Sequence, residues 1–260
     1  MSFDASFARH YDSFSGADYA LWTRLLTNSV AKHAAIPVHE VLDLCCGTGA
    51  LSLMLAGSGY DVVALDFSGD MLSRAHARDS EGSVLFLEQD MRSFELYGSV
   101  QAAVCAYDGF NYLRSAGELE KVLMLLNNYI DIGGLLLFDI NTPYRYREVF
   151  ADNSFVFEGD KVMLVWQNNF NLRTGVNLIN MTIFEEQSDR AYARFDRIDR
   201  QRCFSPDSIK KLLKKAGFGV REILGDEGNF PDGDEEKLYF VAVNEKKCGN
   251  VIFGEKREKK

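Results

Sequence analysis

The sequence lacks long hydrophobic runs and a recognisable leader. Its apolar stretches, such as Val122–Leu126 and Leu135–Phe138, span only a few residues, whereas a membrane-spanning helix needs about 20. We therefore expect no membrane segment. The N-terminus, MSFDASFARHYD, has no basic start followed by an apolar stretch, which predicts no secretory signal and a cytoplasmic location.

Cysteine and histidine are also scarce, with five cysteines and four histidines among 260 residues. The cysteine count is odd, and no two cysteines have the C-x-x-C spacing. Without a secretory signal, this pattern indicates free thiols rather than a disulfide framework. No histidine is spaced with a cysteine as a zinc ligand set would be, so we expect no metal site.

Positive charge is in deficit, since 29 lysines and arginines face 38 aspartates and glutamates for a net charge of −9. Nucleic-acid backbones are bound by concentrated lysine and arginine, so a nucleic-acid partner is disfavoured, although an RNA substrate stays open. The basic cluster of note is the last six residues, EKREKK. We interpret them as the solvated end of a charged tail, residues 246–260.

The sequence does contain a regular alternation of short apolar runs and helix patterns up to residue 140. An amphipathic helix is predicted over 17–31, where Tyr19, Trp22, Leu26 and Val30 recur at helical spacing. Strands that alternate with helices form a mostly parallel sheet with helices on both faces, which predicts a doubly wound α/β domain. The predicted strands are 41–44, 61–65, 84–87, 100–106 and 135–139.

The pattern changes between residues 141 and 204, where no helical period is found. Turn residues separate four strand-like runs, which predicts a small antiparallel β-meander inserted as a lid. The runs are 153–158, 161–170, 176–186 and 190–204, and the last turn between them is Gln187-Ser188-Asp189.

The α/β pattern resumes after the meander. Ser205-Pro206 is a typical helix start, and Gly217 is expected to end that helix. Two last strands are predicted at 218–224 and 237–243. We therefore assign residues 1–140 and 205–245 to one domain, whose first 35 residues form a helical flap.

Acidic residues stand at the ends of the predicted parallel strands, where open α/β sheets bind their ligands. Asp43 precedes the glycine turn Gly47-Thr48-Gly49, and Asp66 follows at the spacing of a ribose-binding carboxylate. Asp90, Asp108 and Asp139 end the later strands. This coincidence favours a nucleoside cofactor.

The turn does not have the glycine pattern of a dinucleotide fold. Ser52 stands where G-x-G-x-x-G requires its third glycine. Asp43 would repel a pyrophosphate but attract an amine or a sulfonium. Both observations favour S-adenosylmethionine (SAM) over NAD.

Five segments in this order resemble the motifs of class I SAM-dependent methyltransferases, and the resemblance covers nearly the whole chain. The N-terminal Tyr11-Asp12 and Asp18-Tyr19-x-x-Trp22 are similar to a bacterial stand-alone subgroup with a β-meander after the fifth strand. The resemblance implies a Rossmann-like, seven-stranded sheet whose antiparallel last strand lies between the sixth strand and the rest. The five segments are VLDLCCGTG (41–49), LDFSGDML (65–72), EQDM (88–91), YDGFNYL (107–113) and FDINTPYR (138–145).

The resemblance also implies roles for individual residues. Asp43 would hold the methionine amine, Asp66 the ribose hydroxyls and Asp90 the adenine amino group. Tyr11, Tyr107 and Asp108 would be the catalytic residues. The full implied cofactor site comprises Tyr11, Tyr19, Trp22, Asp43, Cys46, Gly47, Thr48, Gly49, Asp66, Phe67, Met71, Gln89, Asp90, Met91 and Tyr107, with Tyr11, Tyr19 and Trp22 as the flap.

The acceptor is expected between the cofactor and the meander. Four arginines of the last meander strand, Arg194, Arg197, Arg200 and Arg202, are expected on one face, either as a solvated surface or as an anion-recognition strip. Asp139 with Asn141 offers too few oxygen ligands for a divalent metal. The candidate substrate-binding residues are Asn111, Asp139, Asn141, Trp166 and Arg200.

These inferences lead to a SAM-dependent methyltransferase that acts on nitrogen or oxygen of a small or modest polar molecule. Methyl transfer would be an in-line displacement that leaves S-adenosylhomocysteine. An NAD-dependent oxidoreductase and a non-catalytic SAM-binding partner or sensor are the alternatives. The sequence leaves open a monomer or a homodimer.

Overall fold

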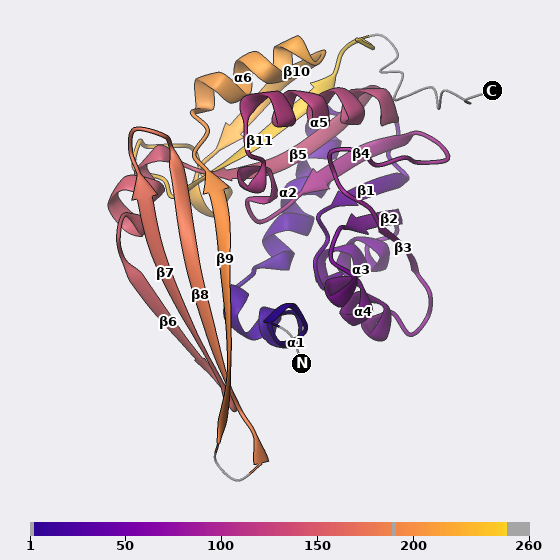
Figure 1. The fold of residues 1–260 in the computed structure, drawn as a ribbon. Coiled ribbons are helices and arrows are strands. Elements are labelled where there is room, and N and C mark those ends of the chain that lie inside the picture. Colours follow the sequence, from indigo (N-terminus) through magenta and orange to yellow (C-terminus); the bar gives the residue numbers. More distant parts are fainter. Residues whose placement is uncertain (1–2, 189–190, 249–260) are drawn as a thin grey trace, which may run out of the picture.

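The structure is a computed structural model that describes residues 3–188 and 191–248. Two sheets form its framework (Figure 1). The larger sheet has the strand order β10-β11-β5-β4-β1-β2-β3. Its strands are β1 (Glu40–Leu44), β2 (Asp61–Asp66), β3 (Val84–Glu88), β4 (Val100–Cys105), β5 (Ile130–Asn141), β10 (Phe218–Leu224) and β11 (Lys237–Asn244).

The predicted fold class is confirmed. Strand β1 pairs in parallel with both β2 and β4, and β4 pairs in parallel with β5. Strand β11 lies between β5 and β10 and is antiparallel to both. The chain order reverses between β1 and β4, and open α/β sheets bind their ligands at the carboxyl ends of the strands beside such a reversal.

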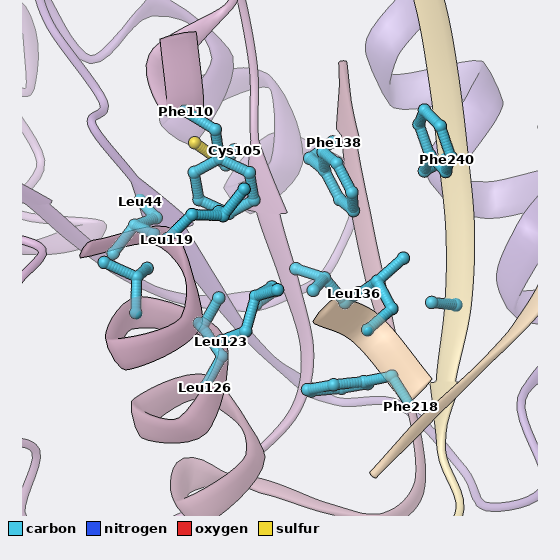
Figure 2. Close-up of a cluster of buried hydrophobic side chains, with 14 of the residues drawn as sticks. Leu44, Cys105, Phe110, Leu119, Leu123, Leu126, Leu136, Phe138, Phe218 and Phe240 are labelled. Atoms are coloured by element: carbon cyan, nitrogen blue, oxygen red, sulfur yellow. The ribbon is translucent and has the colours of Figure 1, made fainter. Parts of the chain in front are cut away.

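Helices cover both faces of the larger sheet, because each presents one apolar stripe. One buried cluster joins α5 and α6 to the sheet, and Figure 2 shows Leu119, Leu123 and Leu126 of α5 facing Leu136 and Phe138 of β5. No helix within the described ranges is long and apolar enough to cross a membrane. The helices are α1 (Phe3–Ser15), α2 (Tyr19–His33), α3 (Ala50–Gly57), α4 (Gly69–Arg78), α5 (Ala116–Tyr129) and α6 (Pro206–Lys215).

The smaller sheet is an antiparallel meander in the order β6-β7-β8-β9, as expected from the hairpin pattern. Its strands are β6 (Ser154–Gly159), β7 (Val162–Asn171), β8 (Val176–Glu186) and β9 (Tyr192–Arg202). A π-helical segment, η2 (Arg145–Phe150), leads into it and had no sequence signal. Asp189 and Arg190 of the predicted turn and strand, and residues 249–260 of the predicted tail, lie outside the described residues.

The expectation that four arginines of β9 share a face is wrong. Side chains alternate along a strand, so Arg197, three residues after Arg194, lies on the opposite face. Arg194 and Arg200 are on the exposed face, whereas Arg197 forms ion pairs with Asp4 and Asp199.

Helix α1 connects the two sheets. Its Phe14 packs into a buried cluster with apolar residues of β7 and β8. The buried carboxylate of Glu185 on β8 accepts a hydrogen bond from Ser6 at 2.7 Å and pairs with Arg9 at 2.6 Å. At the other end of α1, Asp12 pairs with Arg78 of α4. The helix is therefore held by the meander and by the larger sheet's own helices.

We predict that Glu185→Ala loosens α1. Hydrogen bonds to charged groups contribute about 1.5–3 kcal/mol each, so amide exchange across residues 4–14 should accelerate about tenfold or more in hydrogen-exchange mass spectrometry. Glu186→Ala removes the adjacent carboxylate on the opposite face and serves as the control. Equal exchange rates in the two variants would contradict this role of Glu185.

Candidate functional site

The turn after β1 forms the floor of the candidate site. Gly47 and Gly49 have φ angles of 55° and 72°, which disfavour other residues. A Cβ on Gly49 would lie 2.8 Å from the Cβ of Ala75 and 2.9 Å from Phe86, so this glycine allows close packing on α4 and β3. A Cβ on Gly47 would have no atom within 4 Å. The side of Gly47 is therefore the open one, where a ligand can approach the backbone.

Two buried carboxylates lie beside this turn. Asp66, at the end of β2, accepts hydrogen bonds from the N–H of Gly47 and of Ser68, both at 2.9 Å. Asp43, within β1, accepts one from the Ser52 hydroxyl at 2.6 Å. Burial raises the pKa of both carboxyls, that of Asp43 to about 7, and for Asp43 the neighbouring Asp66 adds to the effect. A cation bound at this turn would stabilise both carboxylates and lower their pKa values.

Phe67 follows β2, and Asp90 follows β3. Phe67 is 68% exposed directly after Asp66, and Met91 lies within 4.0 Å, sulfur to sulfur, of Cys45. Asp90 pairs with Arg92, whose hydrogen bonds lower the pKa of Asp90. The Asp90 carboxylate is thus already bound, unlike the free acceptor that we expected for adenine.

Gln89 and Met71 also have structural partners. The amide of Gln89 bonds the backbone of Glu95 in both directions, at 2.8 and 3.1 Å, and so fixes the loop after β3. Met71 is half-buried in the first turn of α4, where its N–H donates to the Ser68 cap.

Tyr107 and Asp108 follow β4 with left-handed φ angles of 57° and 55°. Such backbone is strained for a non-glycine residue, and it concentrates at functional sites. The Tyr107 ring packs against Tyr19 and Trp22, and its buried hydroxyl has no hydrogen-bond partner in the described residues. Trp22 is only 1% exposed and also packs on Tyr239, so it is a core residue beneath Tyr107 rather than part of a flap.

The Asp108 side chain, 19% exposed, is the centre of a polar cluster. One of its oxygens, Oδ2, accepts from Gln201 at 2.6 Å and from Asn141 at 3.0 Å. The other, Oδ1, lies 3.5 Å from the Lys237 ammonium, which also pairs with Asp139 at 2.7 Å. Asp139 in turn accepts the N–H of Asp108 at 2.7 Å. The cluster joins β4, β5, β9 and β11.

Electrostatics in this cluster depend on Lys237. Burial disfavours its ammonium, but the carboxylates of Asp139 and Asp108 outweigh that effect and raise the pKa of Lys237. Burial raises the pKa of Asp139, and Lys237 opposes this shift. A protein ammonium thus occupies the position beside Asp139 that a divalent cation would need.

Tyr11 of α1 lies close to the same cluster. Burial, and then its proximity to Tyr19, Asp108, Tyr112 and Tyr107, raises the pKa of its hydroxyl. The structure therefore brings together all three predicted catalytic residues, Tyr11, Tyr107 and Asp108.

Three predicted substrate residues are supports rather than exposed ligands. Asn111 is buried, donates to the carbonyl of Arg202 at 2.8 Å and accepts the N–H of Asn141 at 3.0 Å. Asn141 and Asp139 are also buried. Asn141 and Asp139 bond Asp108 directly, and Asn111 holds Asn141, so in this structure all three support Asp108.

Two other predicted substrate residues do not join the cluster. Trp166 packs with Phe157 and donates to Asn168 at 3.1 Å on the face of β7 that meets α1. Arg200 is exposed on the outer face of β9, opposite Gln201. The inward residue of this strand end is Gln201, so the substrate role predicted for Arg200 has no support.

Sequence reasoning missed Lys237, Gln201 and Asp12. Asp12 accepts from Thr48 at 2.8 Å and from Tyr19 at 3.2 Å, which places α1 across the glycine turn. Two signals were available. An antiparallel last strand begins where parallel strands end, which predicts Lys237 at the site, and alternation from Phe195 places Gln201 on the inner face.

The chain is similar to methyltransferases in sequence and fold. A methyltransferase-domain family model matches residues 41–134. The chain is 32% identical over 244 residues to YqeM of Bacillus subtilis (strain 168), which carries the name of a methyltransferase, with 92% of this chain and 96% of YqeM covered. It is also 32% identical, over 81% of each chain, to the dTDP-3-amino-3,6-dideoxy-alpha-D-glucopyranose N,N-dimethyltransferase of Streptomyces fradiae. A solved S-adenosylmethionine-dependent methyltransferase of Clostridium acetobutylicum ATCC 824 aligns with a TM-score of 0.82 and 24% identity, over 92% of this chain and 97% of that chain.

We predict a pH-dependent stability contribution from Asp43. Its pKa is about 7 in the folded protein and ordinarily 3.8. Between these values the folded state holds a proton that the unfolded chain has released, so the free energy of unfolding falls as pH rises through this window. In urea unfolding at pH 5 and pH 8, wild type should lose more stability than Asp43→Asn. The same loss in both proteins would contradict the raised pKa.

Proposed function

Because the chain belongs to the class I SAM-dependent methyltransferases, we propose that it transfers the methyl group of SAM to an amine nitrogen of a small polar molecule. Family membership assigns the cofactor and the enzyme class. The oxidoreductase and non-catalytic alternatives are set aside on that ground. The nature of the acceptor is argued below from the Asp108 cluster.

The turn and strand ends fit SAM. The open side of Gly47 leaves room for the methionine part, and the exposed Phe67 ring offers a face for adenine. Asp66 accepts two backbone N–H groups and, because a carboxylate has about four acceptor positions, can still accept ribose hydroxyls. Asp43 is fully buried and cannot touch the cofactor directly. We therefore propose that it attracts the methionine ammonium across the turn or through a water molecule.

When bound, SAM supplies an electrophilic methyl group on a sulfonium, and its neutral thioether leaving group needs no protonation. The protein must align the acceptor and exclude water, and alignment can supply up to about 7–11 kcal/mol. Tyr11, Tyr19 and Tyr107 gather at this point. Their rings would attract a sulfonium by about 0.5–2 kcal/mol through cation–π interaction.

The observation that carries the choice of nitrogen is the charge of the Asp108 cluster. Asp108 and Asp139 share a single ammonium, that of Lys237. The neighbouring Arg145 pairs with Glu236 at 3.4 Å and so leaves this balance unchanged. The cluster therefore has one uncompensated negative charge. Asp108 is partly exposed, so this charge is accessible to a ligand through Asp108.

An amine acceptor would satisfy this charge, because it arrives as an ammonium. We assign Asp108 to hold that ammonium and to take up its proton as the neutral amine forms. The N–C bond then forms while the C–S bond breaks. A hydroxyl acceptor would bring no positive charge to the cluster. The similarity to an amino-sugar N,N-dimethyltransferase supports the same choice.

The proposal is tested by incubating the protein with methyl-labelled SAM and paired acceptors that differ only in an amine or a hydroxyl. Suitable pairs are 3-amino and 3-hydroxy sugar nucleotides, and glycine with glycolate. Mass spectrometry should find label on nitrogen in the amine members. Label on oxygen alone would contradict the proposal.

We predict that Asp66→Ala weakens SAM binding at least about tenfold in calorimetry, because two ribose hydrogen bonds of roughly 1–1.5 kcal/mol each are lost. Asp61→Ala removes an exposed carboxylate from the opposite end of the same strand and should bind as wild type. Unchanged affinity in a folded Asp66→Ala protein would refute the ribose assignment.

We predict that Asp108→Asn keeps SAM affinity within about twofold but lowers kcat/KM for an amine acceptor by about 100-fold or more, in line with loss of a proton acceptor. Asp196→Asn, which neutralises a carboxylate on the outer face of β9, should keep wild-type rates. A wild-type rate in Asp108→Asn would contradict the assignment of Asp108 as the group that holds the acceptor ammonium and takes up its proton.

A further inference from the structure

A second site lies next to the Asp108 cluster but opens elsewhere. It is a surface pocket of about 380 Å³ between the start of α5, the segment η2, the meander and the start of α6. Two of its lining residues, Arg147 and Arg202, directly follow Tyr146 and Gln201, which belong to the buried network around Asp108. The two sites therefore share a wall.

The pocket has an uncompensated positive charge. Arg147 and Arg202 are the only charged side chains among the described residues that line it. Arg147 is exposed and has no hydrogen bond or ion pair with the described part of the chain. Arg202 donates to the carbonyls of Arg114 at 2.6 Å and Thr174 at 3.3 Å, which are neutral groups. Neither guanidinium faces a carboxylate.

The rest of the lining is apolar with hydroxyls at one side. Phe170, Leu172 and Phe204 form the apolar part, and Ser205 and Ser208 bring hydroxyl groups. Leu172 is 73% exposed, so its side chain is accessible to a ligand in the pocket. This combination matches a ligand with an anionic head and an apolar body.

We propose that this pocket binds a small anion carrying an aromatic or aliphatic group, with a carboxylate or phosphate monoester between Arg147 and Arg202. Arginine suits either head group, because its planar guanidinium can donate two parallel hydrogen bonds. The chemistry is opposite to that of the acceptor site, where the free charge is negative. The pocket is therefore a separate binding site.

A ligand in the pocket would change the hydrogen bonding of Asp108. The Phe170 ring stacks on the Tyr146 ring, with centroids 5.3 Å apart. The Tyr146 hydroxyl donates to Gln201 at 3.0 Å, and Gln201 donates to Asp108. A ligand body that shifts Phe170 thus changes the support of Asp108 through three successive contacts. This second step rests on the proposed function, whereas binding itself does not.

Calorimetry with phenyl phosphate, and with inorganic phosphate for comparison, tests the site. Phenyl phosphate should bind saturably and more tightly than phosphate. Arg147→Ala should weaken it about tenfold, as expected for one charge-assisted hydrogen bond. Leu172→Asp, at an exposed position, should weaken it further by placing an acid in the pocket. Arg173→Ala removes a nearby charge outside the pocket and should have less than a twofold effect.

SAM affinity, measured on the same variants, should be unchanged, which separates this proposal from the assignment of the cofactor site. Saturating phenyl phosphate should also change KM or kcat for an amine acceptor in wild type and not in Arg147→Ala. No saturable binding, or equal binding by wild type and Arg147→Ala, would overturn the proposal.

Discussion

The carboxylate of Asp108 is the point where the two sheets of this protein meet, and the site depends on how it is held. Gln201 reaches it from the meander, Asn141 from the parallel strand β5, and Lys237 from the antiparallel strand β11. A partly buried charge is tolerated only when donors surround it. Three separate segments of the chain meet that condition, so the position of the meander relative to the catalytic sheet is tied to the charge state of one side chain.

Strain and burial are concentrated around the same carboxylate. Tyr107 and Asp108 have left-handed backbone, and Asp139 fixes it by accepting the N–H of Asp108. Such backbone costs of order 1–3 kcal/mol per residue, and Lys237 forms a buried ion pair with the Asp139 carboxylate that fixes it. Removing one partner of such a pair leaves an unpaired buried charge. Lys237 is therefore a structural condition for the geometry of Asp108, although it lies more than 100 residues away in the chain.

The sequence predicted the strand ends well because glycines and acids at those ends are local signals. Asp43, Gly47, Asp66 and Asp108 stand where alternation of strands and helices places them. Lys237 and Gln201 were missed because strand alternation identifies them only when it is combined with the strand order of the larger sheet and with the face of the meander that meets it. Trp22 was predicted in a flap but is buried, because a helical stripe of apolar residues does not reveal whether an aromatic side chain faces the core or a ligand.

Helix α1 affects access to the glycine turn. Its Asp12 bonds Thr48 in the glycine turn, while its Ser6 and Arg9 bond Glu185 in the meander. Gly16, with a φ of 57° and open space around it, separates α1 from α2. The contacts of Asp12 with Thr48 and Arg78 are partly exposed, whereas the hydrogen bond between Ser6 and Glu185 is buried, so the contacts of Asp12 cost less to break. The end of α1 that lies across the glycine turn is thus held more weakly than the end bound to the meander, as a site that must admit and release a ligand requires.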